Sequence, residues 1–452
     1  MDRLRYLGLR ASSRLLRWVR ERLTPAGRLA LAGLIASAVW GVDTNVSMAY
    51  QAFTLLLCLL AAALGLSFML GWSPMLRRLR LARVLPRFAT AEQPFSCRLT
   101  VENPGAYPVR GLLLREEPPQ ARPSWASFHA AADPPDDRFH WVERLAGYSR
   151  WRRLLAPERA TASLPAVPAL APGGRVSVEV RIVAPRRGRL ALSAPSVGLP
   201  EPLGLALGWR RLSLEGSMLV LPKRYPVPRL ALPGSRRYQQ GGVALAAAVG
   251  DSQEFLGLRD YRPGDALRRI HWASWAKTGK PVVKEYRDEY FVRHALALDT
   301  FVAAGGPAFE EAVSVAASFA CSVLTQESLL DLIFVGAEEH CLTAGRGLAG
   351  ADRLLEALAC AQPCPGASFE ALATALLRRR EGLSGCIAVL LDWDEERRAL
   401  VRALRGSGVP VLALVVLPEG REAPAEAPDG PARFLQPGRI AEGLAALGSR
   451  GG

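Results

Sequence analysis

The sequence contains few of the residues from which metal and thiol sites are built. Among 452 residues there are only five histidines and seven cysteines. The histidines share no metal-ligand spacing, and Cys360 and Cys364 have the wrong gap for a zinc knuckle. An odd, scattered set of cysteines is typical of reduced thiols in the cytosol. These shortages exclude a zinc finger and a disulfide-stapled secreted domain.

Complete catalytic motifs are also absent from the sequence. Residues 274–281, SWAKTGKP, lack the first glycine of a phosphate-binding P-loop, and a proline replaces the Ser/Thr that would hold magnesium. Residues 382–386 lack the second glycine of a nucleophile elbow. His271 could act as an acid or base, but a structural role at a helix end or turn explains it more simply. We therefore expect no enzyme.

Positive charge is confined to two short segments, although the formal net charge is +15. Residues 1–28 hold eight arginines against two acids, and residues 73–88 hold five arginines and no acid. Residues 29–72, between them, carry one charge, Asp43. Because the basic residues flank an apolar region and form no broad patch, the sequence argues against a nucleic-acid partner.

The apolar region contains two runs, residues 29–42 and 46–72. The second run is long enough to cross about 30 Å of hydrocarbon. Arginine on both outer flanks and none in the connecting turn predicts a two-span hairpin in the inner membrane, with the leader 1–28, both termini and the soluble domains cytoplasmic. One alternative is a single span with a re-entrant segment. Another is a cleaved signal peptide, disfavoured by the long Arg-rich leader and the missing cleavage site.

Beyond the anchor, residues 73–228 carry short segments of alternating apolar residues separated by proline and glycine. This pattern predicts an antiparallel β-sandwich of immunoglobulin-like type. Residues 119–170, rich in Pro, Arg and Trp, interrupt it as an insertion, and the Gly/Ala-rich residues 229–249 are typical of a connector.

From residue 291 to 452 the pattern changes to apolar strands that alternate with helices. Strands that are apolar on both faces predict a doubly wound parallel sheet. Ligands bind such sheets at the carboxyl ends of the strands, which places Asp299, Thr300 and Asp392 at the expected binding edge.

Residues 250–290 pack charged, aromatic and turn residues too densely for a plain core strand. Arg-Pro-Gly-Asp at 262–265 predicts a tight turn, and Asp265 is placed to cap the short helix expected after it. Asp260 and Asp265 could be paired carboxylates, but capping and salt bridges to nearby arginines explain them more simply. Three of the four lysines of the chain also lie here, which indicates an ion-pair network or an anion-binding patch: Lys277, Lys280 and Lys284.

The same block resembles the family catalogued as domain of unknown function 58. The family hallmark is E-F-x-x-L-R-x-Y-x-x-G-D, followed by R-x-I-x-W and a basic stretch. The matching residues are Glu254, Phe255, Leu258, Arg259, Tyr261, Gly264, Asp265, Arg268, Ile270, Trp272, Lys277 and Lys284. A second family segment that ends in D-P-F-G-L has its counterpart at 201–205, where the sequence is Glu-Pro-Leu-Gly-Leu.

The resemblance implies a two-helix anchor, a von Willebrand factor A-like C-terminal domain, and work beside MoxR-type AAA+ ATPases in envelope or complex assembly. A von Willebrand-type metal site needs D-x-S-x-S after the first strand, because oxygen ligands hold the magnesium. This chain has Asp-Thr-Phe-Val-Ala at 299–303, so both serines are lost. We therefore expect no cofactor, with a degenerate site at Asp299, Thr300 and Asp392 and magnesium as a minor alternative.

We predict a membrane-anchored scaffold or adaptor. Its 250–290 block, including His271 and Lys280, either docks a partner or serves as a clasp between domains. Aromatic and Arg side chains favour docking, since they carry most of the binding energy at interfaces. The alternatives are a divalent-metal-dependent ligand-binding module that uses Asp299 and Asp392, and, less favoured, a hydrolase at the membrane face.

Overall fold

The structure is a computed structural model, and the chain divides into two compact units, Met1–Leu221 and Pro222–Gly452, each described by itself below. The residues that the structure describes are 2–40, 47–116, 123–130, 148, 151, 154, 161–163, 165–228, 254–265, 267–287, 292–303, 305–322, 328–336, 338–345, 350–418, 421 and 432–447. The predicted connector 229–249 and the turn containing Asp43 lie outside the described residues.

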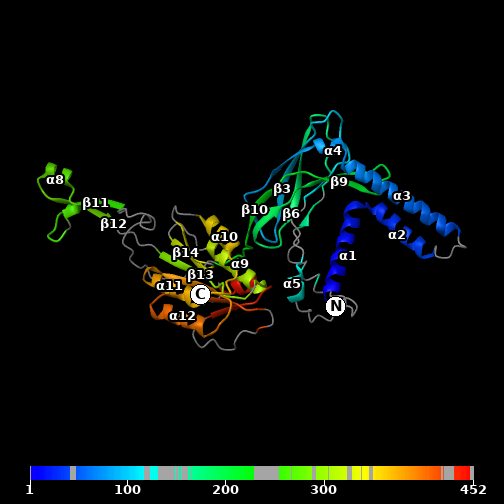
Figure 1. The fold of residues 1–452 in the computed structure, drawn as a ribbon. Helices are drawn as coiled ribbons and strands as arrows, with labels where there is room; N and C mark the ends of the chain where they lie inside the picture. The colour runs from blue at the N-terminus through cyan, green and yellow to red at the C-terminus, as the bar shows by residue number, and fades with distance from the viewer. Residues whose placement is uncertain are drawn as a thin grey trace. The chain divides into compact units, whose positions relative to one another are not determined.

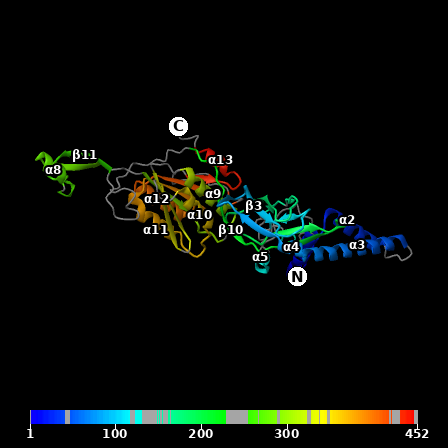
Figure 2. The same ribbon diagram turned by 90° about the horizontal axis from the view of Figure 1, so that it is seen from above.

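The first unit begins with helices α1 (Asp2–Arg22), α2 (Pro25–Trp40), α3 (Ser47–Gly71) and α4 (Pro74–Arg78). Both α2 and α3 are apolar, and they lie side by side (Figures 1 and 2). Within the described part of the chain, one helix, α3, is long and apolar enough to cross a membrane. With 16 residues, α2 spans about 24 Å, short of a typical hydrocarbon core of about 30 Å. One spanning candidate is therefore found where two were predicted.

Three small sheets follow, and their buried residues form two apolar clusters. Strand β1 falls in the basic flank 73–88, and two of its five residues are arginines, Arg80 and Arg83. Strand β4 pairs with β8, not with β3, which precedes it in the chain. The strands are β1 (Arg80–Val84), β3 (Pro94–Glu102), β6 (Arg175–Val183) and β5 (Thr161–Ala162) in the first sheet, β2 (Phe88–Thr90), β10 (Gly216–Leu221) and β7 (Gly188–Leu192) in the second, and β4 (Leu113–Arg115), β8 (Ser196–Pro200) and β9 (Leu207–Arg211) in the third.

The segment 119–170 contributes to two parts of this unit. Its helix α5 (Trp125–Ala130) packs against α1 through a cluster of Phe128, Trp151 and Tyr6. Its end joins the β core, because β5 pairs with β6 and Leu170 exchanges two backbone hydrogen bonds with Val109.

The turn after β8 holds the β sheets to the helices. The Glu201 carboxylate accepts hydrogen bonds from the backbone N–H groups of Leu203 (2.5 Å), Leu205 (2.5 Å) and Ala206 (3.1 Å), which stabilises the turn. The Leu205 carbonyl then accepts from the Thr24 N–H at 3.0 Å, at the start of α2. The residues that resemble the D-P-F-G-L segment therefore form a joint between the β sheets and the apolar helices.

Gly27 in α2 has no room for a side chain at this joint. A Cβ there would lie 1.9 Å from the Leu205 carbonyl oxygen, whereas a Cβ at Gly65 in α3 would meet nothing within 4 Å. We expect Gly27→Ala to lower the free energy of unfolding by about 1–3 kcal/mol through overpacking. The measurement is the thermal unfolding midpoint of the detergent-solubilised chain, with Gly65→Ala as the matched control. Equal unfolding midpoints for the two variants would contradict the close packing of Gly27 against the Leu205 carbonyl.

The second unit contains a six-stranded sheet in the order β15-β14-β13-β16-β17-β18, with helices on both faces (Figure 1). All neighbouring strands are parallel except the edge pair β14 and β15. The predicted alternation of strands and helices is present. The elements are β13 (Val292–Leu298), α9 (Pro307–Ser322), β14 (Ser328–Val335), β15 (Glu339–Ala344), α10 (Ala351–Cys360), α11 (Glu370–Arg379), β16 (Gly385–Leu390), α12 (Glu395–Gly406), β17 (Val411–Val416), β18 (Ala432–Leu435) and α13 (Ile440–Ala445).

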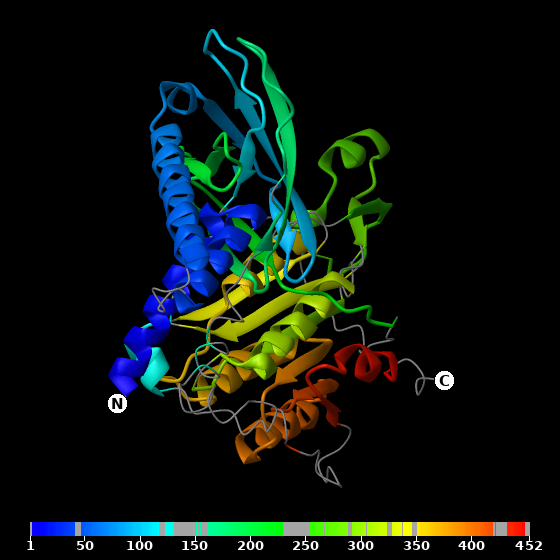
Figure 3. The same ribbon diagram turned by 90° about the vertical axis from the view of Figure 1, so that its right-hand side faces the viewer.

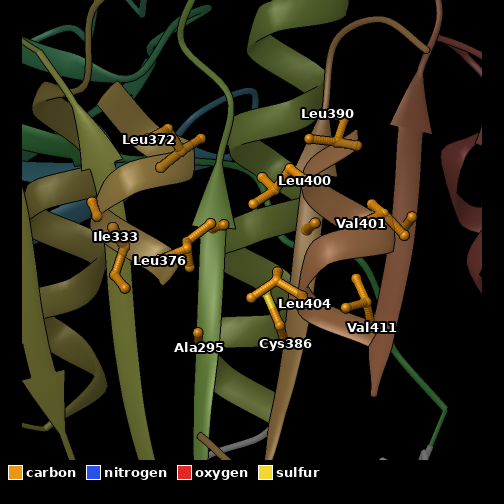
Figure 4. Packing of buried hydrophobic residues seen from close by; sticks show 14 of the residues in the cluster. Ala295, Ile333, Leu372, Leu376, Cys386, Leu390, Leu400, Val401, Leu404 and Val411 are labelled. Atoms are coloured by element: carbon orange, nitrogen blue, oxygen red, sulfur yellow. The ribbon is translucent and has the colours of Figure 1, made fainter. Parts of the chain in front are cut away.

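Helices α11 and α12 cover one face of this sheet with apolar side chains (Figure 4). Leu372 and Leu376 of α11 and Leu404 of α12 are fully buried against strand residues such as Ala295 and Ile333. This apolar layer fixes the positions of β13 and β16. Asp299 and Asp392 follow the carboxyl ends of these two strands.

Candidate functional site

The described residues of the 250–290 block, 254–265 and 267–287, form a hairpin with a helical insert at its closed end (green in Figure 3). Strands β11 (Glu254–Asp260) and β12 (Val282–Arg287) pair antiparallel with a bulge between Phe255 and Gly257. A 3₁₀ turn, Leu267–Arg269, and helix α8 (Trp272–Thr278) lie between them. Glu254 and Phe255 lie on β11 and Lys284 on β12, so the family-matching residues gather on one element of structure.

Asp265 locks the turn of this hairpin. Its two carboxylate oxygens accept hydrogen bonds from Nη1 and Nη2 of Arg259 at 2.8 and 2.7 Å, and the Arg262 N–H adds a third at 2.8 Å. The hydrogen bond from Arg259, followed by the one from the Arg262 backbone, lowers the pKa of Asp265 to about 2. Gly264 has φ 106°, a left-handed conformation that favours glycine. A salt bridge to a nearby arginine was therefore the right interpretation of Asp265.

The prediction that Asp265 caps the following helix is wrong, because Arg259 engages its carboxylate. His271 caps α8 instead: its Nδ1 accepts from the Ser274 N–H at 3.3 Å and lies 2.7 Å from the Ser274 hydroxyl. The His271 N–H donates to the Val282 carbonyl at 2.8 Å, and the neighbouring Ile270 is buried against Val283. This geometry assigns His271 a structural role that holds α8 to β12.

The closed end of the hairpin, residues 261–281, is named the hairpin tip below. It exposes two large apolar side chains, Leu267 at 68% and Trp272 at 63%. Trp272 stacks on Trp275 with ring centroids 5.3 Å apart, so its position is supported from behind. Of the aromatic residues considered as anchors, Trp272 is exposed, whereas Tyr261 and Trp275 are half-buried.

Exposed cations lie on the same hairpin tip. They are Arg262, Arg268, Lys277 and Lys280. Asp265 is the one acid in the tip sequence, and it is paired with Arg259; Asp260, just before the tip, is exposed. The tip thus exposes apolar and positively charged side chains together, a composition that suits an acidic protein surface.

The second candidate region is the carboxyl edge of the six-stranded sheet. Asp299, directly after β13, is fully buried, and hydrogen bonds engage both of its carboxylate oxygens. Oδ1 accepts from the Phe301 N–H at 3.0 Å. Oδ2 accepts from the Leu391 N–H at 3.1 Å and from Nε of Arg397 at 2.7 Å.

Arg397 supplies the positive charge at this edge. Burial alone would lower the pKa of Arg397, but its hydrogen bond to Asp299 and the charges of Asp299 and Asp394 raise that pKa above the ordinary value. The guanidinium also lies over the Phe369 ring, 4.6 Å from its centroid, and its Nη1 pairs with Asp394. An arginine of α12 therefore stands where a cation would be needed to neutralise Asp299.

The other two residues of the predicted degenerate metal site are also engaged. The Thr300 hydroxyl donates to the Val335 carbonyl at 2.5 Å, and Asp392 pairs with Arg421 at 2.8 Å. In the described ranges, no group of three or more His, Cys, Asp or Glu side chains is placed to hold a metal ion. Magnesium needs several unengaged oxygens in a near-octahedral shell, so the residues at this edge do not fit it.

Arg397 was not predicted from the sequence, because the metal motif consists of acids and hydroxyls. A signal was present: Asp394 caps α12, accepting from the Arg397 N–H at 3.0 Å, which sets Arg397 in the first turn of the helix after β16. Side chains at that position in a doubly wound fold point towards the carboxyl edge of the sheet.

Comparisons with known proteins match the C-terminal part of the chain. Residues 257–428 match the model of the family described as "Protein of unknown function DUF58". The "Uncharacterized protein YeaD" of Bacillus subtilis is 27% identical over 156 residues, which cover 34% of this chain and 38% of that protein. Among solved structures, a red sea bream transglutaminase matches at 16% identity over 32% of this chain and 15% of the transglutaminase chain. The TM-score of 0.17 is too low to indicate a shared fold.

Proposed function

Since residues 257–428 belong to the DUF58 family, we propose that the chain is a membrane-anchored scaffold or adaptor that docks a partner protein through its hairpin tip. The observation that carries this proposal is that Leu267 and Trp272 are exposed on the same hairpin tip as four exposed cations. The partner is an acidic protein, and the resemblance suggests a MoxR-type AAA+ ATPase acting in envelope or complex assembly.

Three features of the fold support this architecture. Helix α3 is long and apolar enough to serve as an anchor in the inner membrane. Helix α2 would form the second arm of the transmembrane helical hairpin, with the soluble domains on the cytoplasmic side. The strand order of the second unit, with one antiparallel edge strand, supports a von Willebrand factor A-like domain. The three mostly antiparallel sheets of the first unit, with apolar clusters between them, support an immunoglobulin-like sandwich.

Trp272→Ala in the hairpin tip tests docking directly. We expect it to weaken binding of the purified cognate MoxR-type ATPase by roughly tenfold or more, because a desolvated Trp at an interface centre typically contributes about 2 kcal/mol or more. The measurement is equilibrium binding to the full chain in detergent, at low and high salt. The exposed cations of the tip predict that affinity falls as salt increases.

The matched control is Tyr107→Ala, which removes an aromatic side chain that is 78% exposed in the β unit. It should leave the affinity unchanged. If Trp272→Ala and Tyr107→Ala bind the ATPase equally well, the tip is not the docking surface. If the ATPase does not bind the wild-type chain at all, the proposed partner is wrong.

We propose no enzymatic role and no metal-dependent one. Asp265 and His271, the acid and the imidazole that could take part in hydrolysis, hold the turn and cap α8. Asp299 is paired with Arg397, and that pair opposes the divalent-metal alternative.

A further inference from the structure

Helix α1 presents an apolar stripe to solvent. Residues 4, 7, 11, 15 and 18 follow the three- and four-residue spacing of one helix face. Four of them are large and exposed: Leu4 (75%), Leu7 (49%), Leu15 (63%) and Trp18 (44%). A stripe of this kind normally faces a core or another apolar medium, so its exposure here requires an explanation.

Contacts on another face of α1 fix its rotation. The Tyr6 ring is buried, 5.6 Å from that of Trp125, 5.7 Å from Phe128 and 5.8 Å from Trp151, and its hydroxyl donates to the Pro123 carbonyl at 3.2 Å. Turning the stripe inwards would break this aromatic cluster. The stripe is therefore directed away from the protein core.

The end of α1 is joined to the apolar helices. The Glu21 carbonyl accepts from the Trp209 indole N–H at 2.7 Å, and α2 begins at Pro25, three residues after α1 ends. The chain turns sharply there, so α1 runs across the direction of α2 and α3 (Figure 1). A helix that crosses the end of a membrane span lies at the level of the lipid headgroups.

The charge of α1 identifies the medium. The helix holds seven arginines and two acids, and both acids are paired: Asp2 with Arg5 at 3.3 Å and Glu21 with Arg115 at 3.4 Å. The excess of arginine opposes packing against a second copy of the same helix and suits a surface of negative charge. Apolar side chains flanked by arginine are typical of helices that lie on anionic membranes.

We propose that α1 lies in the interface of a bilayer with anionic headgroups, with Leu4, Leu7, Leu15 and Trp18 inserted at the acyl boundary. The inference rests on the membrane anchoring proposed above. It adds a second, lateral attachment, which holds the β unit against the membrane surface through the Tyr6 cluster and the Glu201 joint.

The test reconstitutes the full chain into vesicles whose lipids carry bromine near the headgroup end of the acyl chain. Bromine quenches a nearby indole, and the difference between wild type and Trp18→Phe isolates the fluorescence of Trp18. The difference between wild type and Trp72→Phe isolates Trp72, at the end of α3, and reports on the anchor. We expect both signals to be quenched in phosphatidylcholine vesicles that contain phosphatidylglycerol, and the Trp18 signal to lose less in phosphatidylcholine alone.

Each outcome is decisive. Quenching of Trp72 without Trp18 overturns the lateral attachment and leaves the anchor in place, whereas quenching of neither overturns the anchor itself. Equal quenching of Trp18 with and without phosphatidylglycerol overturns the choice of anionic headgroups. Quenching of Trp18 that disappears when the ATPase binds would reassign the stripe to a protein partner.

Discussion

Replacing Arg397 with methionine is expected to lower the free energy of unfolding of the C-terminal unit by about 3–5 kcal/mol. The variant keeps an unbranched apolar stem but leaves the carboxylate of Asp299 buried without its cation. The neighbouring N–H groups of Phe301 and Leu391 remain as donors, but they carry no full charge. The measurement is the unfolding midpoint of the detergent-solubilised chain in denaturant.

Two control variants test whether the loss of stability comes from the buried ion pair. Arg402→Met alters an exposed ion pair with Glu395 on the same helix and should cost no more than about 1 kcal/mol. The double change Arg397→Met with Asp299→Asn should recover much of the loss, because no uncompensated charge then stays buried. A loss for Arg397→Met no larger than for Arg402→Met would contradict the role of Arg397.

A magnesium titration separates this account from the divalent-metal alternative. A metal that binds the folded chain raises its unfolding midpoint with concentration. With Arg397 paired to Asp299, we expect no such rise in the wild type. A rise in the wild type that Asp299→Asn abolishes would restore the metal-dependent module as the better interpretation.

Replacing Arg83 with methionine is expected to destabilise the β unit by about 3–5 kcal/mol. Arg83 pairs with Glu116 at 2.5 Å and donates to the Ser193 carbonyl at 2.8 Å, and both side chains of the pair are almost fully buried. Without Arg83, the Glu116 carboxylate stays buried and loses its ion pair with that arginine. We therefore expect the β core to open far more often.

The thiol of Cys97 reports that opening. It is fully buried, and burial, followed by the charge of Glu116, raises its pKa to about 11. Its rate of modification by a thiol reagent, followed by mass spectrometry, should rise by roughly a hundredfold or more in Arg83→Met, since each 1.4 kcal/mol of lost stability is about tenfold in the open population. Arg98→Met, which removes an exposed pair with Glu179, should leave the rate nearly unchanged. Similar rates in the two variants would refute the prediction.

Local sequence patterns were sufficient for the general architecture. Apolar runs between arginine-rich flanks predicted the apolar helices α2 and α3, and the two periodicities separated a β unit from an α/β unit. The density of charged, aromatic and turn residues at 250–290 marked the segment that contains the hairpin, and the family resemblance rested on the same residues. Periodicity succeeds here because burial of one face repeats every two residues in strands and about every 3.6 in helices.

Tertiary structure alone decided which charged groups meet. Asp299 and Arg397 are 98 positions apart, and they come together because β13 and β16 are neighbours in the sheet. For Asp265 the sequence offered a helix cap or a salt bridge to a nearby arginine, and the turn at 262–265 brings its carboxylate to Arg259 at the end of β11. Likewise, the stripe on α1 could be recognised as unpartnered only once the Tyr6 cluster had fixed the rotation of the helix. Sequence spacing records which face of an element is apolar, whereas its partner is set by packing between distant segments of the chain.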